Sequence, residues 1–344
     1  MTFEAIIKDL KNKIYHPVYF LQGDETYYID LISDYIEKSV LDDGEKEFNQ
    51  TILYGKDVDV SAILSYAKRF PMMSNYQVLI IKEAQDIRNL VKKTDKDGKE
   101  TRDDFLQYVE NPLKSTLLVL CYKYSTIDKR TKLAKTIDKK GVLFESKKLY
   151  DNQIPDWVNA YCTKHKYKIS PKAVQMIADF LGTDLSKVSN ELDKLMLNIS
   201  AIEAINEKRI EQYIGISKDY NIFELTTALA KKDVLKANRI VNYFGANPKV
   251  SPFVLTLGML YNYFIKILKY HGLADKSRNN AASEIGVSPF FMQEYELAAK
   301  NYPMNKLVRI FSALREYDLK SKGMETTGIE EGELLKELIF KILH

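Results

Sequence analysis

The chain of 344 residues has little of what marks a metal centre, a disulfide scaffold or a familiar catalytic site. Its two cysteines, Cys121 and Cys162, stand far apart without a CxxC partner, which excludes a disulfide framework and a cysteine zinc site. The four histidines lack HExxH spacing, and the sequence contains no GxSxG. We therefore expect no metal, no cofactor and no catalytic residue.

Long apolar runs are also missing. The longest, around residues 253–261, contains Thr256 and Gly258 and is far shorter than the roughly 20 residues that cross a bilayer. The first residues show no basic segment followed by an apolar one, which argues against a secretory signal. These absences predict a cytoplasmic protein without a membrane partner.

The excess of basic residues is small and lies in one segment. The formal charge is only +4, but residues 129–148 hold eight Lys or Arg against two acids. The rest of the chain is therefore slightly acidic. Such a balance does not by itself indicate nucleic-acid binding, whereas a local basic segment can follow a phosphate backbone.

The hydrophobic pattern changes character near residue 150. Before it, apolar runs of strand length alternate with helix-like stretches, which is typical of a parallel sheet covered by helices. The predicted strands are Val18–Leu21, Phe48–Leu53, Gln77–Ile81, Leu117–Cys121 and Val142–Phe144. After it, the sequence predicts helices only. The fold class is therefore α/β plus all-α, with domains at 1–146, 147–215 and 216–344.

Local signals support the helical part. Pro171 follows Ser170 at a predicted helix start, where the missing N–H costs least. A second helix is predicted over Asp184–Leu197, and a loop near Ile214–Asn221 marks the second boundary. The last segment predicts five or six longer helices. It ends on apolar residues at helical spacing: Leu334, Leu335, Leu338, Ile339, Ile342 and Leu343.

A phosphate loop is expected after the first strand of a nucleotide-binding sheet. That position reads Gly23, Asp24, Glu25, with one glycine, no lysine and two carboxylates in the first helical turn. The carboxylates complement the helix dipole themselves and repel a phosphate. The position is a degenerate phosphate loop, which argues against ATP binding.

The basic segment has two interpretations. As one helix, it places Lys129, Lys132, Lys135 and Lys139 on a common face above apolar residues, and with Arg130 it could contact DNA. The alternative is an ordinary solvated face of an amphipathic helix, which the pattern alone favours.

An apolar connection is the most suggestive feature. Phe70, Pro71, Met72 and Met73 follow a predicted helix over residues 60–69 and precede the strand at Gln77. Pro71 ends the helix, so both methionines lie where turn chemistry favours polar residues. Methionine side chains adapt well to a partner's apolar pocket. Alternatively, the connection folds back over its own core.

Several segments, in order, resemble the delta subunit of bacterial DNA polymerase III. They are Pro17–Glu25, Val78–Ala84, Asp128–Leu133, Asp184–Leu195, Asn221–Thr226, Pro252 with Phe264, Ile285–Phe290 and Tyr317–Lys320. The resemblance implies an AAA+-like first domain, a small helical lid domain and a helical collar domain for oligomerisation. It further implies an ATPase-dead subunit of a holoenzyme with DNA-directed DNA polymerase activity.

The resemblance also implies a role in DNA replication. In that family, delta opens the ring-shaped sliding clamp, the beta subunit, with a hydrophobic pair that aligns with Met72 and Met73. The pair is often Leu-Phe, so Phe70 could supply the missing ring. Expected partners are the clamp, the gamma/tau and delta-prime loader subunits, and primer–template DNA.

Two other classes of function stay open from the residues themselves. A stand-alone nucleic-acid-binding protein could use the basic segment 129–148, and tight, salt-sensitive DNA binding by the chain alone would favour it. An enzyme with an unrecognised site in the α/β part would be stabilised thermally by a nucleotide.

Overall fold

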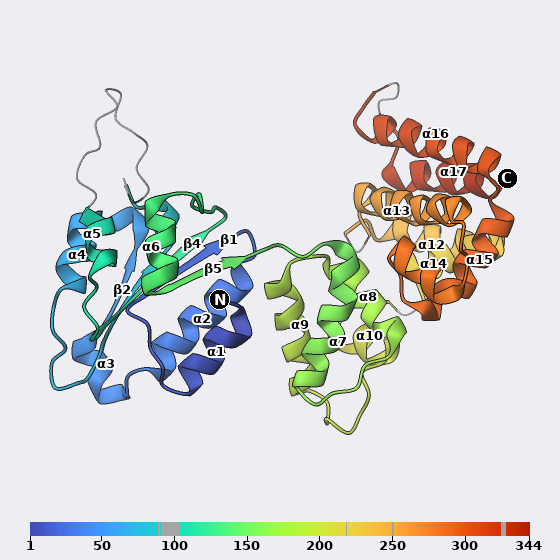
Figure 1. Ribbon diagram of the computed structural model, residues 1–344. Coiled ribbons are helices and arrows are strands. Elements are labelled where there is room, and N and C mark those ends of the chain that lie inside the picture. The colour runs from blue at the N-terminus through green and yellow to red at the C-terminus, as the bar shows by residue number, and fades with distance from the viewer. Residues whose placement is uncertain (89, 91–103, 218, 250, 325–327) are drawn as a thin grey trace, which may run out of the picture. The chain divides into compact units, whose positions relative to one another are not determined.

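The computed structural model describes residues 1–88, 90, 104–217, 219–249, 251–324 and 328–344. The chain forms two compact units, Met1–Leu149 and Tyr150–His344. The first contains a sheet with helices and the second is helical (Figure 1). Mixed α/β followed by all-α is therefore confirmed as the fold class.

The first unit is built on a five-stranded parallel sheet with the order β2-β3-β4-β1-β5. Its strands are β1 (Val18–Gly23), β2 (Gln50–Tyr54), β3 (Gln77–Lys82), β4 (Thr116–Lys123) and β5 (Val142–Ser146). Because all strands are parallel, their amino ends share one edge of the sheet and their carboxyl ends share the other. The five predicted strands are confirmed, with one shifted start.

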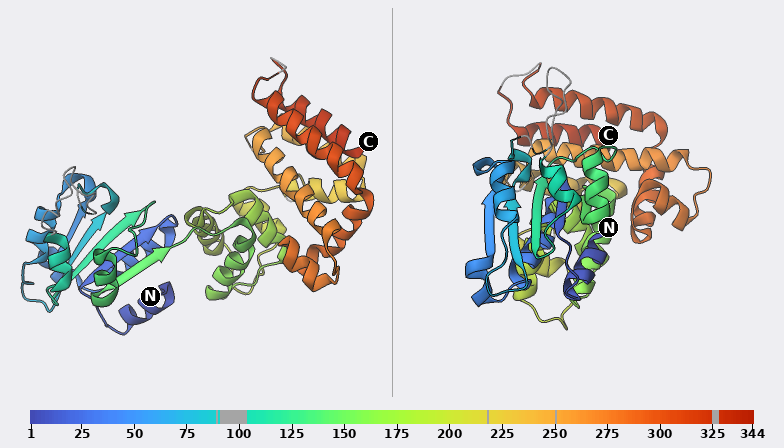
Figure 2. Two further views of the ribbon diagram at one scale, coloured as in Figure 1. Left: turned by 45° about the horizontal axis from the view of Figure 1, so that its top comes forward. Right: turned by 60° about the vertical axis from the view of Figure 1, so that its left-hand side comes forward.

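Helices cover both faces of this sheet (Figures 1 and 2). They are α1 (Phe3–Lys11), α2 (Thr26–Ser39), α3 (Asp43–Asn49), α4 (Val60–Ala67), α5 (Asp104–Glu110) and α6 (Lys132–Lys140). Alternate residues of β1 enter different cores: Val18 and Phe20 pack with α4, α5 and α6, whereas Tyr19 and Leu21 pack with α1 and α2. Burial on both faces explains why the strands read as continuous apolar runs.

The predicted start of the second strand is wrong. Phe48 belongs to α3, and β2 begins at Gln50. A capping box starts this helix: the Asp42 carboxylate accepts from the Glu45 N–H, and the Glu45 carboxylate accepts from the Asp42 N–H. These two local bonds stabilise a helical turn that the apolar pattern alone does not reveal.

The second unit contains eleven α-helices among the described residues. Four come first: α7 (Ile154–Lys164), α8 (Pro171–Leu181), α9 (Leu185–Leu197) and α10 (Glu207–Ile214). The Ser170 hydroxyl caps α8 ahead of Pro171, and the Asp184 carboxylate caps α9, so both predicted helix starts are confirmed. The division near residue 215 into lid and collar domains stays a prediction.

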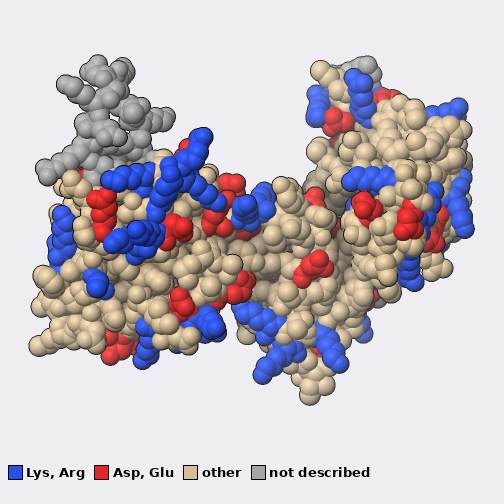
Figure 3. All heavy atoms as spheres, viewed as in Figure 1, with Lys and Arg blue, Asp and Glu red and all other residues tan. Residues whose placement is uncertain are grey.

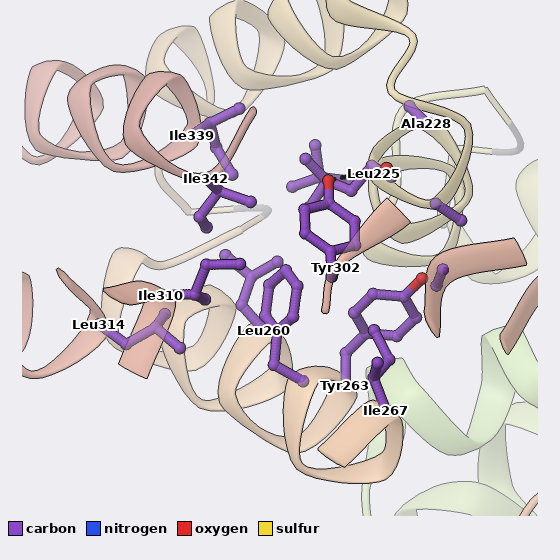
Figure 4. Packing of buried hydrophobic residues seen from close by; sticks show 14 of the residues in the cluster. Leu225, Ala228, Leu260, Tyr263, Ile267, Tyr302, Ile310, Leu314, Ile339 and Ile342 are labelled. Carbon is purple, nitrogen blue, oxygen red and sulfur yellow. Dashed lines mark hydrogen bonds between the residues drawn. The ribbon is translucent and has the colours of Figure 1, made fainter. Parts of the chain in front are cut away.

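The remaining helices share one large core (Figure 4). They are α11 (Ile222–Lys231), α12 (Val234–Ala246), α13 (Phe253–Gly272), α14 (Arg278–Ile285), α15 (Met292–Asn301), α16 (Met304–Ser321) and α17 (Glu331–Leu343). They number seven in the described part, rather than the five or six expected. The predicted apolar stripe of the last helix is buried along its whole length. Tyr302 lies in this core, and its hydroxyl donates to the Leu229 carbonyl at 2.8 Å.

Membrane-spanning helices and metal sites were searched for among the residues that the structure describes. Within the described residues, no helix combines the length and apolar content that crossing a bilayer requires. The same residues contain no group of three or more His, Cys, Asp or Glu side chains that could hold a metal ion.

Candidate functional site

The apolar connection, residues 68–76, joins the end of α4 to the start of β3. It therefore lies at the amino edge of the sheet, where Gln77 pairs in register with Thr116 of β4. The degenerate phosphate-loop position follows β1 and lies at the opposite, carboxyl edge. The two sequence features thus mark two different ends of the first unit.

The apolar side chains of this connection point into solvent. Phe70 is 76% exposed and Met72 is 64% exposed, while Met73 is as open as in an extended chain; Pro71 is half-buried. These side chains do not fold back over the unit's own core, so the alternative of a self-covering connection is wrong.

The buried side-chain amide of Asn49 holds the centre of the connection. Its Oδ1 accepts a hydrogen bond from the Met72 N–H at 2.6 Å, and its Nδ2 donates to the Met72 carbonyl at 2.9 Å. Nδ2 also donates to the Glu45 carbonyl of α3 at 3.1 Å. The backbone of Met72 is thereby tied to α3 while its side chain stays free.

The beginning of the connection is anchored by a second amide. The Nε2 of Gln77 lies within hydrogen-bonding distance of the Arg69 carbonyl and 2.7 Å from Thr116 Oγ1. The Thr116 hydroxyl donates in turn to the Ala67 carbonyl at 3.0 Å. These bonds satisfy carbonyl groups at the end of α4 that have no helical partner. Apolar side chains are thus displayed on an anchored backbone.

Phe48 is an exposed apolar residue that the sequence analysis did not assign to this site. It is 67% exposed and precedes Asn49, whose amide contacts the backbone of Met72. Phe48 therefore adds an exposed aromatic residue to α3, the helix that is hydrogen-bonded to the connection. The capping-box sequence beginning at Asp42 was the signal that could have revealed it, because that box moves Phe48 from a buried strand to a surface helix.

The carboxyl edge is closed by the chain itself at the degenerate phosphate loop. A Cβ on Gly23 would lie 2.0 Å from the Ser146 carbonyl oxygen, and φ of Gly23 is 127°, so the position requires glycine. The buried Glu25 carboxylate accepts from the Tyr27 N–H at 3.0 Å and caps α2, while Asp24 is exposed. The prediction that both carboxylates lie in the first helical turn was wrong, because α2 begins at Thr26. The Glu25 carboxylate instead occupies the cap position, where a phosphate would otherwise bind.

An ion-pair cluster lies beside this position, at the ends of β3 and β4. The Lys123 ammonium is 2.9 Å from Asp30 Oδ1 and 3.2 Å from Glu83 Oε1. Burial works against the charged ammonium, but hydrogen bonds to both carboxylates outweigh it and raise the pKa of Lys123. Burial likewise opposes the charge of Glu83, yet hydrogen bonds from Gln85 and Lys123 lower its pKa. This edge is therefore held by internal ion pairs.

The basic segment forms a helix only in part. The Thr131 hydroxyl caps α6, which begins at Lys132, so placing Lys129 on the same helical face was wrong. Lys129 pairs with Glu145 at 2.5 Å and Arg130 with Asp128 at 2.7 Å, so each of these exposed cations has an acidic partner. Lys132 pairs with Glu110 at 2.8 Å. Lys135 and Lys139 are exposed on α6, where blue side chains gather in Figure 3.

The sheet with its two helical layers, followed by an all-helical unit, defines a mixed α/β protein with a helical C-terminal part. A family model described as DNA polymerase III, delta subunit, matches residues 19–147. A second, described as DNA polymerase III delta subunit, C-terminal domain, matches residues 219–342. The chain belongs to the family of DNA polymerase III delta subunits, as the ordered resemblance predicted, and its role is that of a clamp-loader subunit in DNA replication.

The chain is similar to several individual proteins. DNA polymerase III subunit delta of Bacillus subtilis (strain 168) is 26% identical over 341 residues, which cover 98% of this chain and 95% of that protein. The solved structure of the Bacillus subtilis DNA clamp loader delta protein (YqeN) is similar with a TM-score of 0.57 and 22% identity, over 99% of each chain. The RuvB Holliday junction branch migration motor of Thermotoga maritima gives a TM-score of 0.34 at 11% identity, over 88% of this chain and 89% of that one.

Proposed function

We propose that the chain binds the ring-shaped sliding clamp through the connection 68–76 and favours the opened ring. The observation that carries this proposal is the exposure of Phe70, Met72 and Met73 on a backbone that two side-chain amides, of Asn49 and Gln77, anchor. Removing exposed apolar side chains from water is favourable, so covering them with a partner stabilises the complex. We include Phe48 in the proposed contact, because it is exposed on α3, the helix that is hydrogen-bonded to the connection.

The mechanism is one of differential binding. A ligand shifts a closed–open equilibrium only by the difference between its affinities for the two states. The apolar surface of the chain must therefore fit a pocket that is more accessible or better shaped in the opened ring. No bond is made or broken in this step, so the chain supplies binding energy and needs no catalytic residue.

Other partners follow from the same family assignment. We assign the contacts with gamma/tau and delta-prime subunits to the helical residues 216–344, and the site of action to the cytoplasm. Lys132, Lys135 and Lys139 of α6 would approach primer–template DNA within the assembled loader. Because the charge of Lys132 is partly neutralised by Glu110, the main contribution comes from Lys135 and Lys139.

The decisive experiment compares the purified natural chain with a Met72→Ala, Met73→Ala double variant. Each is titrated against the sliding clamp of the same organism without ATP, by calorimetry. We expect binding by the natural chain and its loss in the double variant, with unchanged circular dichroism because neither side chain is buried. Full affinity in the double variant would remove the connection from the clamp contact.

A further inference from the structure

Asn49 is unusual because its buried polar side chain forms most of its hydrogen bonds with the backbone of an exposed connection. Only 4% of its surface is accessible, yet two of its three bonds go to the backbone of Met72, 23 positions along the chain. The third goes to the Glu45 carbonyl of its own helix. The side chain therefore links α3 to the connection at one peptide.

The next residue has a backbone conformation that needs such support. Met73 has φ of 52°, in the left-handed region that is unfavourable for a residue with a Cβ. Strained residues of this kind persist when surrounding contacts over-determine them, and they gather at ligand-binding positions. The two bonds from Asn49 to Met72 supply that constraint directly before the strained residue. Without them, the connection can relax to other conformations.

We propose that Asn49 is a positioning residue for clamp binding: it holds the connection 68–76 in its binding conformation before the clamp arrives. This inference rests on the proposed clamp contact and deepens it. The apparent dissociation constant of a site rises in inverse proportion to the fraction of molecules in the competent conformation. Fixing Met72 and Met73 in advance thus strengthens binding without adding any contact to the clamp.

The first test is clamp affinity of the full chain with Asn49→Ala. Losing both bonds to Met72 lowers the fraction of molecules that hold the binding conformation, and we expect roughly a tenfold weaker affinity. The matched control is Asn247→Ala at the end of α12. Asn247 is half-buried, and its side chain, like that of Asn49, donates a hydrogen bond to the carbonyl four residues earlier, here that of Tyr243. We expect this control to bind the clamp like the natural chain.

Two further readouts separate positioning from general loss of structure. The Met72 amide proton, which bonds to Asn49 Oδ1, should exchange slowly in the natural chain and quickly in Asn49→Ala, with protection restored by the clamp. In Asn49→Asp, the carboxylate keeps the acceptor for the Met72 N–H but repels the Met72 carbonyl. Because this position is buried, the pKa of the new carboxyl is raised, and its protonation at mildly acidic pH restores a donor. Relative to the natural chain, its clamp affinity should therefore be higher at pH 5 than at pH 7.5.

The results distinguish this inference from the proposed function. Unchanged clamp affinity in Asn49→Ala, alongside lost binding in the double methionine variant, would overturn the role of Asn49 and leave the clamp contact standing. Unchanged affinity in the methionine variant would overturn the clamp contact itself. If Asn49→Ala does not fold, the Asn49→Asp variant decides. A clamp affinity equal to that of the natural chain at both pH 5 and pH 7.5 would overturn the role of Asn49.

Discussion

Met72 and Met73 differ in exposure, and this difference predicts unequal contributions to clamp binding. Fully burying an exposed methionine contributes about 1.5–3 kcal/mol. With 64% of its side chain exposed, Met72 can gain roughly 1–2 kcal/mol, whereas the fully exposed Met73 can gain the whole amount. Alanine retains a small part of each contact. Replacing both should therefore cost about 2–4 kcal/mol, or roughly 30- to 700-fold in affinity.

The single variants make the reasoning testable. We expect Met73→Ala to weaken clamp affinity more than Met72→Ala, measured by calorimetry without nucleotide at one salt concentration. A Met304→Ala, Met324→Ala variant is the matched control, because both residues are exposed methionines of the helical unit. A reversed order, a double variant weakened less than fivefold, or an equal loss in the control would refute the assignment of this surface.

Three further predictions concern other parts of the molecule. Phe48→Ala should weaken clamp affinity about fivefold to twentyfold, measured as above, because two thirds of its side chain is free to be covered. Burial raises the pKa of Asp179 to about 6, so ionisation of this carboxyl destabilises the folded chain as the pH rises from 3.8 through 6. We therefore expect Asp179→Asn to be about 1–2 kcal/mol more stable than the natural chain at pH 7.5, measured by urea unfolding. The difference in stability should vanish below pH 4. Lys135→Gln with Lys139→Gln should lower the salt slope of duplex-DNA affinity of the assembled loader by about two, because each phosphate contact contributes about 0.9.

Each of these predictions has a result that contradicts it. Natural clamp affinity in Phe48→Ala would limit the contact to the connection. A stability difference for Asp179→Asn that is independent of pH would show that packing, rather than ionisation, is responsible. An unchanged salt slope in the double lysine variant would remove α6 from the DNA path and leave its lysines as a solvated face.

Local sequence signals predicted much of the fold. Ser170 before Pro171 and Asp184 before an apolar stripe gave correct helix starts, because caps act through hydrogen bonds within three residues. The apolar spacing of the last helix likewise predicted its buried face. Where two local signals competed, as at Phe48, the capping box outweighed the apolar pattern and the predicted strand was wrong. The ordered resemblance identified the family, although no single motif did.

The sequence by itself determined most of the elements, the apolar residues of the connection and the carboxylate that caps α2. Only the tertiary structure decided that Met72 and Met73 are exposed, that Asn49 holds the peptide of Met72, and that the Ser146 carbonyl closes over Gly23. It also paired Lys129 with Glu145 across 16 positions of the chain. The physical reason is that local hydrogen bonds and periodicity act over a few residues, whereas these contacts exist only after the parallel sheet has brought distant segments to a common edge.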